Sequence, residues 1–318
     1  MPRFFQPLRH LFFALAATLP SLPTAAQDTC PPPLEVAAPK VLEQLARNAT
    51  DRGFLWTFEK NGQVSYLYGT LHAQKLAWFG AGPQLRTALK SAHAVALEMD
   101  PSDATLQASL IAAQPDGAAA NVLPERMRMR LQARMAAECV DPTTLQNLSP
   151  ELQVTMLSLL AARRDGLEVT YGSELALAYA ARAMNKPVFS LESAADQMRA
   201  LTPSSTAERN ALMDRSLTAL SDGSARRVLA QAADYWASSN GDALARYTEW
   251  CECTHTDAER AQLKRLLDER NPQLADRMAA LQARTGSLLT GVGALHMFGP
   301  NNLPDLLRQR GYVVTRVH

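Results

Sequence analysis

Ser287-Leu-Leu-Thr-Gly-Val-Gly-Ala-Leu-His296 is an apolar run that ends in a Gly-x-x-His motif, and it decides the fold that we predict. The same pattern occurs much earlier, in Val64-Ser-Tyr-Leu-Tyr-Gly-Thr-Leu-His72. Each run has the length of a buried strand and stops at a glycine. In open α/β sheets, functional sites form at the carboxyl ends of the strands. We therefore expect two strands whose ends bring His72 and His296 to one site.

Each motif opens a strand–helix–strand unit. After the first motif, the sequence predicts a helix over 84–92 and a buried strand over 93–100. After the second motif, it predicts a helix over 303–310 and a strand over 312–317. An internal pseudo-repeat accounts for both copies. The predicted fold class is α/β, with a central mixed sheet built from two β-GxxH-α-β half-units.

The rest of the chain adds a hairpin before the first motif and a helical segment between the units. Strand-like runs at 54–59 and 64–68 flank Asn61-Gly62, which is a strong hairpin signal. Residues from about 103 to 284 are rich in helix-forming side chains, apart from one short strand at 188–192 that ends in a carboxylate. No linker divides the chain. We expect residues 27–318 to form a single domain whose helical middle, about 103–284, is a large insertion covering the sheet.

Composition restricts the class of partner. Of the 318 residues, 47% are hydrophobic and 20% are charged, which is typical of a globular protein. The net charge of +1 and the absence of a long basic block disfavour binding to nucleic acid or to an anionic membrane surface. The predicted helical middle could form either a substrate cover or a homodimer face.

The first 26 residues have the pattern of a cleavable signal peptide. Arg3 and Arg9 form a basic region, Leu11–Leu19 is apolar, and Thr24-Ala-Ala26 supplies the small residues of a cleavage site. The apolar run is much shorter than the ~18 residues of a membrane span, and no later run reaches that length. The sequence thus predicts cleavage after Ala26, a periplasmic or secreted protein, and no membrane span.

Four cysteines remain after this cleavage, an even number that indicates disulfides in an oxidising compartment. Bonding Cys251 to Cys253 would close a very short ring. We therefore expect one of the other two pairings, in which one of these cysteines joins Cys30 and the other joins Cys139. The rival interpretation is a Cys-x-Cys metal or redox site beside His255, which we rank below disulfides.

Two histidines and three carboxylates are the candidate site residues: His72, His296, Glu98, Glu174 and Glu192. Glu98 and Glu192 end predicted strands, and Glu174 begins a predicted helix. Mixed imidazole and carboxylate sites suit Zn²⁺, Mn²⁺, Fe²⁺ or Co²⁺. Such an ion lowers the pKa of its bound water to about 7, and a nearby glutamate can act as general base.

Each of these residues also has a purely structural interpretation. A single histidine after a strand is more often a hydrogen-bonded structural residue than a ligand, and only the matched pair favours a site. Glu98 and Glu192 could pair with arginines, and Glu174 could be a helix N-terminal acid. Other chemistries lack their motifs, because the sequence has no Gly-x-Ser-x-Gly elbow, His-Glu-x-x-His pair, P-loop or dinucleotide fingerprint.

Several short motifs, in order, resemble the TraB/GumN family over about residues 53–317. They are Tyr68-Gly-Thr-Leu-His72, Ala96-Leu-Glu-Met-Asp100, Gly172-Ser-Glu174, Lys186-Pro-Val-Phe-Ser-Leu-Glu192 with Gln197, Arg270-Asn271, Gly293-Ala-Leu-His296, Leu306-Leu307 and Gly311-Tyr312. The family is similar to the Tiki metalloproteases and more remotely to erythromycin esterases and ChaN-type haem-binding lipoproteins. The resemblance implies an α/β fold with paired Gly-x-x-His motifs at the site.

The resemblance also implies a function and roles for residues. Together with the predicted export, it implies a secreted metal-dependent hydrolase that uses Mn, Co or Zn to cleave peptide bonds in a peptide or protein substrate. His72 and His296 take the active-site role, with Glu98 as the acidic partner and Glu192 as a further catalytic carboxylate. The expected metal ligands are His72, His296, Glu98 and Glu174, although Glu174 stands where the family often has Asp. The alternatives are a non-catalytic haem- or metal-binding module and a metal-free esterase with a histidine base.

Overall fold

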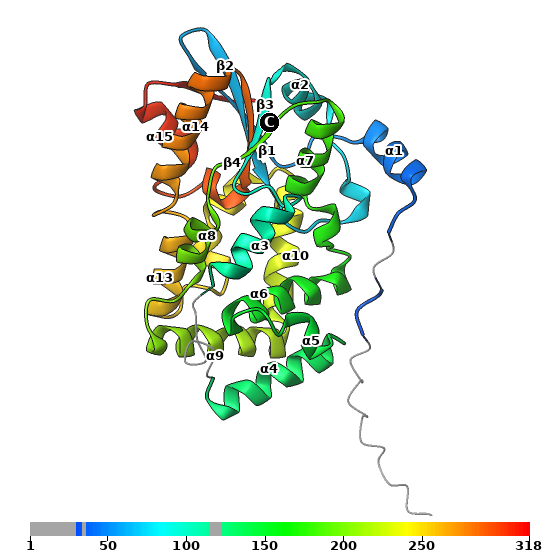
Figure 1. Cartoon of the computed structure of the whole chain (residues 1–318), viewed down its shortest axis with the longest axis vertical. Coiled ribbons are helices and arrows are strands. Elements are labelled where there is room, and N and C mark those ends of the chain that lie inside the picture. The colour runs from blue at the N-terminus through cyan, green and yellow to red at the C-terminus, as the bar shows by residue number, and fades with distance from the viewer. Residues whose placement is uncertain (1–29, 34–35, 115–122) are drawn as a thin grey trace, which may run out of the picture.

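The computed structural model describes residues 30–33, 36–114 and 123–318 (Figure 1). The predicted signal peptide lies outside the described residues. One mixed sheet has the strand order β4-β3-β5-β2-β1-β6. Only β1 is antiparallel to its neighbours; the other pairings are parallel. The strands are β1 Phe54–Lys60, β2 Gln63–Thr70, β3 Ala94–Leu97, β4 Val188–Ser190, β5 Leu288–Gly293 and β6 Val313–Arg316. The predicted α/β class and mixed sheet are confirmed.

The connections after β2 and β5 leave in opposite directions, which creates a switch point between these adjacent strands. From β2 the chain passes through α2 (Pro83–Ser91) to β3, on the far side of β5. From β5 it passes through α15 (Leu303–Gln309) to β6, on the far side of β2 and β1. Such a switch point opens a crevice at the carboxyl ends of the two strands. Thr70 pairs with Gly293 there, so both Gly-x-x-His motifs end at this crevice.

Helices cover both faces of the sheet. In Figure 1, α14 (Asn271–Thr285) and α15 lie to the left of the sheet, and α2 and α7 (Ser173–Ala183) lie to the right. Between these layers the strands contribute fully buried side chains such as Phe54, Leu67 and Leu288. A parallel strand with both faces covered is expected to be largely apolar, as the run 288–292 is apart from the buried Thr290.

The helical segment lies below the sheet in Figure 1, at the edge where the parallel strands end. It packs around its own core, which includes Leu157, Met213 and Leu217. Trp236 Nε1 donates to Gly69 O at 2.8 Å and so fixes α10 against the end of β2. The predicted helical insertion is thus confirmed. Its helices are α3 Ala104–Ala112, α4 Glu125–Ala137, α5 Pro142–Leu145, α6 Pro150–Ala161, α8 Ala194–Leu201, α9 Thr206–Asp222, α10 Ser224–Ala237, α11 Gly241–Ala245, α12 Tyr247–Trp250 and α13 Asp257–Leu266.

Before the sheet, the short helix α1 (Pro39–Asn48) precedes β1. Short 3₁₀ turns join the other elements, and the last of them contains His296 of the second Gly-x-x-His motif. They are η1 Leu76–Trp78, η2 Ala162–Asp165, η3 Val169–Tyr171 and η4 Ala294–Met297. Within the described part of the chain, no helix has the length and apolarity needed to cross a membrane.

The hairpin between β1 and β2 turns through Asn61 and Gly62, both with positive φ (54° and 77°). Positive φ at both positions defines a type I′ turn. We expect Gly62→Ala to lower the free energy of unfolding by about 1–2 kcal/mol, because a β-carbon disfavours this backbone region. No atom lies near the added carbon, so the cost is conformational. Urea denaturation measures it; Gly62→Asn is the control, and an equal cost for Asn would contradict the explanation.

The predicted cysteine pairing was wrong. The disulfides are Cys30–Cys139 and Cys251–Cys253. The short ring closes because Glu252 has a left-handed φ of 53°, which folds the chain back. The Cα atoms of Cys251 and Cys253 come within 5.1 Å, inside the normal disulfide range. The sequence argument failed because it did not allow this backbone conformation at a residue other than glycine.

Candidate functional site

A cavity of about 280 Å³ lies at the carboxyl ends of β2 and β5. His72, His296, Glu98 and Arg270 line it and, with Tyr247, supply its ionisable groups. The helical segment supplies much of its apolar wall, including Val228, Leu229, Leu244, Leu266 and Leu267. The cavity therefore combines a polar end on the sheet with an apolar cover, as ligand-binding pockets commonly do.

His72 follows β2 in a loop that is fixed against the start of α7. The Leu71 backbone N–H donates to Ser173 Oγ at 2.7 Å, and the Ser173 N–H donates back to Leu71 O at 3.0 Å. This approach requires a glycine at position 172, where a β-carbon would lie 2.3 Å from His72 O. The Gly172-Ser173-Glu174 motif thus positions the first histidine.

The imidazole of His72 is paired with a buried carboxylate. Its Nδ1 lies 2.9 Å from Glu174 Oε1, which also accepts a hydrogen bond from Thr70 Oγ1 at 2.6 Å. The negative charge of Glu174 raises the pKa of His72 to about 9, although desolvation opposes the shift. The imidazole is open to the cavity, with 66% of the side chain exposed, so solvent partly screens the pair. The raised pKa favours the form of His72 with a proton on both ring nitrogens.

His296 has the opposite electrostatic environment. It lies in η4, directly after β5, and is 4% exposed. Its Nδ1 is 2.5 Å from Asn271 Oδ1, and Asn271 Nδ2 donates to Asn301 O, which fixes the orientation of the amide. Because the amide oxygen can only accept, Nδ1 carries the proton and Nε2 has the lone pair. Burial, together with the nearby charge of Arg270, lowers the pKa of His296 to about 4.

Arg270 connects two buried glutamates behind the histidines. Its Nε donates to Glu192 Oε1 at 2.9 Å, and its Nη2 bonds to both Glu192 Oε2 and Glu98 Oε2. Its Nη1 lies 3.4 Å from His296 Nε2. Glu98 Oε1 accepts the Gly293 N–H at 2.6 Å and lies 3.9 Å from His296 Nε2. Burial acts to raise the pKa of Glu98, but His296, Arg270 and the Gly293 N–H bring it well below its usual range.

The structure brings all five predicted site residues to one region, in two layers. His72, His296 and Glu98 line the cavity. Glu174 and Glu192 lie behind it: Glu174 orients His72, and Glu192 holds Arg270 together with Gln197, whose Nε2 donates to Glu192 Oε2 at 2.6 Å.

Sequence reasoning missed the roles of Arg270 and Asn271. The pair appears among the family-like motifs, which was the only available signal. Its position within the predicted helical segment did not indicate that the guanidinium reaches Glu98, 172 positions away, or that the amide fixes a histidine tautomer.

A direct test of the two environments is an NMR titration of the imidazoles. We expect the titration midpoint of His72 near pH 9 and that of His296 near pH 4, for the reasons given above. Glu174→Gln should move the His72 midpoint back toward the ordinary value of 6.5. Because the pKa of His72 is higher in the folded state, protonated His72 stabilises the fold. This contribution is fully present below pH 6.5 and is lost as the pH rises through about 9.

The matched control for that titration is Glu151→Gln, because Glu151 pairs with Arg209 and does not contribute to the His72 shift. It should leave the midpoint unchanged. An unshifted His72 in the wild type would contradict the proposed pairing with Glu174.

An α/β sheet with a Gly-x-x-His motif at each of two adjacent strand ends defines the class of this protein. The model of the TraB/PrgY/gumN family matches residues 54–316, and the chain belongs to this family. It is 28% identical over 249 residues to a protein from Shigella flexneri described as "Uncharacterized protein YbaP", covering 77% of this chain and 88% of the relative. It is also 28% identical over 248 residues to the protein of the same description from Escherichia coli (strain K12), covering 76% and 87%. No solved structure matches the chain.

Proposed function

We propose that this protein is a hydrolase in which His296 is the base and His72 is the acid. The observation that carries the proposal is that one cavity holds two imidazoles with different partners, a carboxylate for His72 and a carboxamide for His296. Pairs of titratable groups whose environments separate their pKa values are typical of acid–base catalysis. The two relatives carry no described activity, so the proposal rests on the site itself.

The proposed reaction uses the ring nitrogens that face away from these partners. His296 Nε2 would accept a proton from a water molecule as its oxygen attacks the substrate carbonyl. His72 Nε2–H would donate a proton to the leaving group, and Glu174 would keep His72 charged. The guanidinium of Arg270 adds positive charge near His296, where it favours the negative charge that develops on the carbonyl oxygen. General acid–base groups of this kind contribute about 10²–10⁴-fold each.

Peptide bonds are the substrate class that we propose. The apolar wall from α10, α11 and the end of α13 would accept an apolar side chain next to the scissile bond. The similarity of the family to the Tiki metalloproteases favours the same class.

A metal-dependent form of the same hydrolase is the second candidate. Both Nδ1 atoms are held by oxygen acceptors, which is how metal-bound histidines are commonly oriented. His72, His296 and Glu98 would hold a Mn, Co or Zn ion, which when bound would supply an activated water molecule. Glu174 fits as the orienting partner of His72 rather than as a ligand. Among the residues that the structure describes, no three potential ligands are grouped to hold a metal as they stand, and Arg270 already neutralises Glu98.

Metal analysis separates the two candidates. Elemental mass spectrometry should find no stoichiometric metal in the purified protein, and hydrolysis should persist in the presence of a chelator. Near-stoichiometric metal that is lost in His72→Ala/His296→Ala, with activity lost on chelation, would establish the metal-dependent form instead. A strong visible absorption band would indicate bound haem and would contradict both hydrolase candidates.

A further inference from the structure

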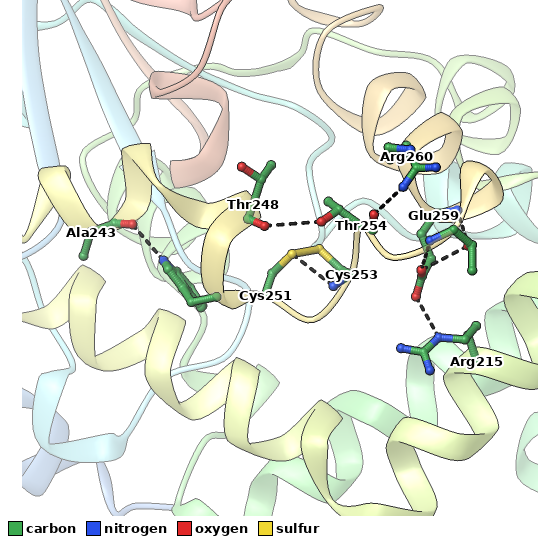
Figure 2. The surroundings of a disulfide bond; sticks show 10 residues. Arg215, Ala243, Thr248, Cys251, Cys253, Thr254, Glu259 and Arg260 are labelled. Atoms are coloured by element: carbon green, nitrogen blue, oxygen red, sulfur yellow. Dashed lines mark hydrogen bonds and ion pairs between the residues drawn. A yellow bond between two sulfur atoms is a disulfide. The ribbon is translucent and has the colours of Figure 1, made fainter.

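A disulfide between cysteines only two positions apart lies outside the hydrolytic cavity. Cys251 directly follows α12, and Cys253 lies in the loop that leads to α13; Figure 2 shows the bond between them. Neither cysteine lines the cavity that holds the histidines. The proposed hydrolysis therefore makes no use of this bond, although the helices on both sides contribute to that cavity.

The backbone inside the ring favours opening of the bond. Glu252 has a φ of 53°, in the left-handed region that side chains with a β-carbon disfavour. Reduction of the disulfide lets this residue relax to an ordinary conformation. Disulfides that hold such conformations are more easily reduced and are often the catalytic ones.

The two sulfur atoms lie in different environments. Cys251 is 3% exposed, whereas Cys253 is partly exposed. The Cys253 backbone N–H donates to Cys251 Sγ at 3.2 Å, as Figure 2 shows. A hydrogen-bond donor favours the thiolate, which makes Cys251 the better leaving group. An incoming thiol can reach only Cys253 easily.

The loop around the bond is held in place independently of the sulfur atoms. Thr254 Oγ1 donates to Thr248 O at 3.3 Å, and Arg260 Nη1 donates to Thr254 O at 2.6 Å (Figure 2). Neither contact involves a sulfur atom, so reduction breaks neither of them directly, and they can keep the cysteines close enough to form the bond again.

A separate cavity of about 190 Å³ borders the disulfide. Cys251, Glu252 and Cys253 form part of its wall, together with polar side chains that include Arg215 and Glu259. The two charges are paired with each other, with Arg215 Nε 3.0 Å from Glu259 Oε1. The cavity has room for a cysteine side chain with its flanking polar backbone.

We propose that Cys251–Cys253 is a thiol–disulfide exchange site that oxidises pairs of thiols in peptides. The first substrate thiolate attacks Cys253 Sγ, forms a mixed disulfide, and releases Cys251 as the thiolate. The second substrate thiolate attacks the substrate sulfur of the mixed disulfide and releases Cys253. The substrate becomes a disulfide, the protein becomes a dithiol, and two protons are released or retained by the protein thiols. An external disulfide such as oxidised glutathione restores Cys251–Cys253.

The second disulfide of the chain is an internal control. Cys30 and Cys139 are both exposed, so access alone would favour their reduction. Cys139 also has a left-handed φ of 54°, but backbone hydrogen bonds in the turn that ends α4 hold it there, so this conformation does not depend on the bond. Intact protein is equilibrated with mixtures of reduced and oxidised glutathione, and free thiols are alkylated and identified by mass spectrometry. We compare the ratio of reduced to oxidised glutathione at which each disulfide is half-reduced. We expect this ratio to be lower for Cys251–Cys253 than for Cys30–Cys139 by about tenfold or more. Equal or greater resistance of Cys251–Cys253 would overturn the proposal.

Single variants test the assigned order of attack. With oxidised glutathione as the probe, Cys251→Ser should form a mixed disulfide on Cys253 about tenfold or more faster than Cys253→Ser forms one on Cys251, because the Cys251 sulfur is buried. Equal rates, with circular dichroism showing both variants folded, would contradict the assignment. If either variant fails to fold, the comparison of the two disulfides in the wild type still decides the proposal.

Transfer to a substrate is measured with a synthetic peptide that contains two cysteines. One equivalent of wild-type protein should oxidise one equivalent of the peptide, and excess oxidised glutathione should allow repeated turnover. The variant Cys251→Ser/Cys253→Ser retains Cys30–Cys139 and should oxidise the peptide no faster than buffer does. Equal oxidation by this variant and the wild type would overturn the proposal.

Discussion

Arg270→Met should lower the free energy of unfolding by about 3–5 kcal/mol, the cost typical of removing one partner of a buried ion pair. Arg270 is 12% exposed and contacts Glu98 and Glu192, which are 10% and 2% exposed in their side chains. Without the guanidinium, two buried carboxylates lose their counter-charge and must either bind protons or recruit water. Urea denaturation at neutral pH measures this loss of unfolding free energy. A loss as small as that caused by breaking an exposed ion pair would contradict the account.

Two further variants identify the cause of that loss. Arg47→Met removes an arginine from an exposed pair with Glu43 and should leave the unfolding midpoint nearly unchanged. Arg270→Met/Glu98→Gln/Glu192→Gln neutralises the carboxylates and should recover much of the lost stability. If the triple variant does not regain this stability, packing of the arginine rather than its charge stabilises the site.

His296→Ala should lower the rate of hydrolysis by about 10²–10⁴-fold, because it removes the group that we propose as the general base. The imidazole is held in one tautomer by Asn271, and its Nε2 lies beside Arg270. The measurement is kcat/KM on a peptide that the wild type cleaves, with circular dichroism as a check of the fold.

The matched control for this variant is His93→Ala. His93 lies just before β3, where its Nδ1 accepts from the Ser287 N–H at 3.3 Å, and it does not line the cavity. It should keep the wild-type rate within a few-fold. Similar losses in both variants would indicate a general effect on the fold and would contradict a specific role for His296.

The sheet could be predicted because its signals are local. Asn61-Gly62 determines the turn, and the two apolar runs that stop at Gly-x-x-His predict the strands that end at the site. The pairing was harder to predict, since β5 lies between β2 and β3. Glu98 therefore contacts the second motif, through the Gly293 N–H, more directly than the first.

Other features depend on contacts between distant residues and could not be predicted. The contact of Arg270 with Glu98 depends on how α14 is placed against the sheet, which no local pattern specifies. The Cys251–Cys253 bond depends on the left-handed conformation of Glu252, which local preferences disfavour. The signal peptide, the periplasmic or secreted location, the single domain over 27–318 and the possible homodimer stay predictions.

The most direct test of the central claim is a digest of a diverse peptide library, with cleavage products identified by mass spectrometry. The wild type and His72→Ala/His296→Ala are compared at equal concentration, after circular dichroism has shown both to be folded. The account predicts new peptide ends with the wild type, enriched in apolar residues beside the cleaved bond, and none above background with the double variant. No cleavage by the wild type, or equal cleavage by the double variant, would contradict a hydrolytic site formed by the two Gly-x-x-His motifs.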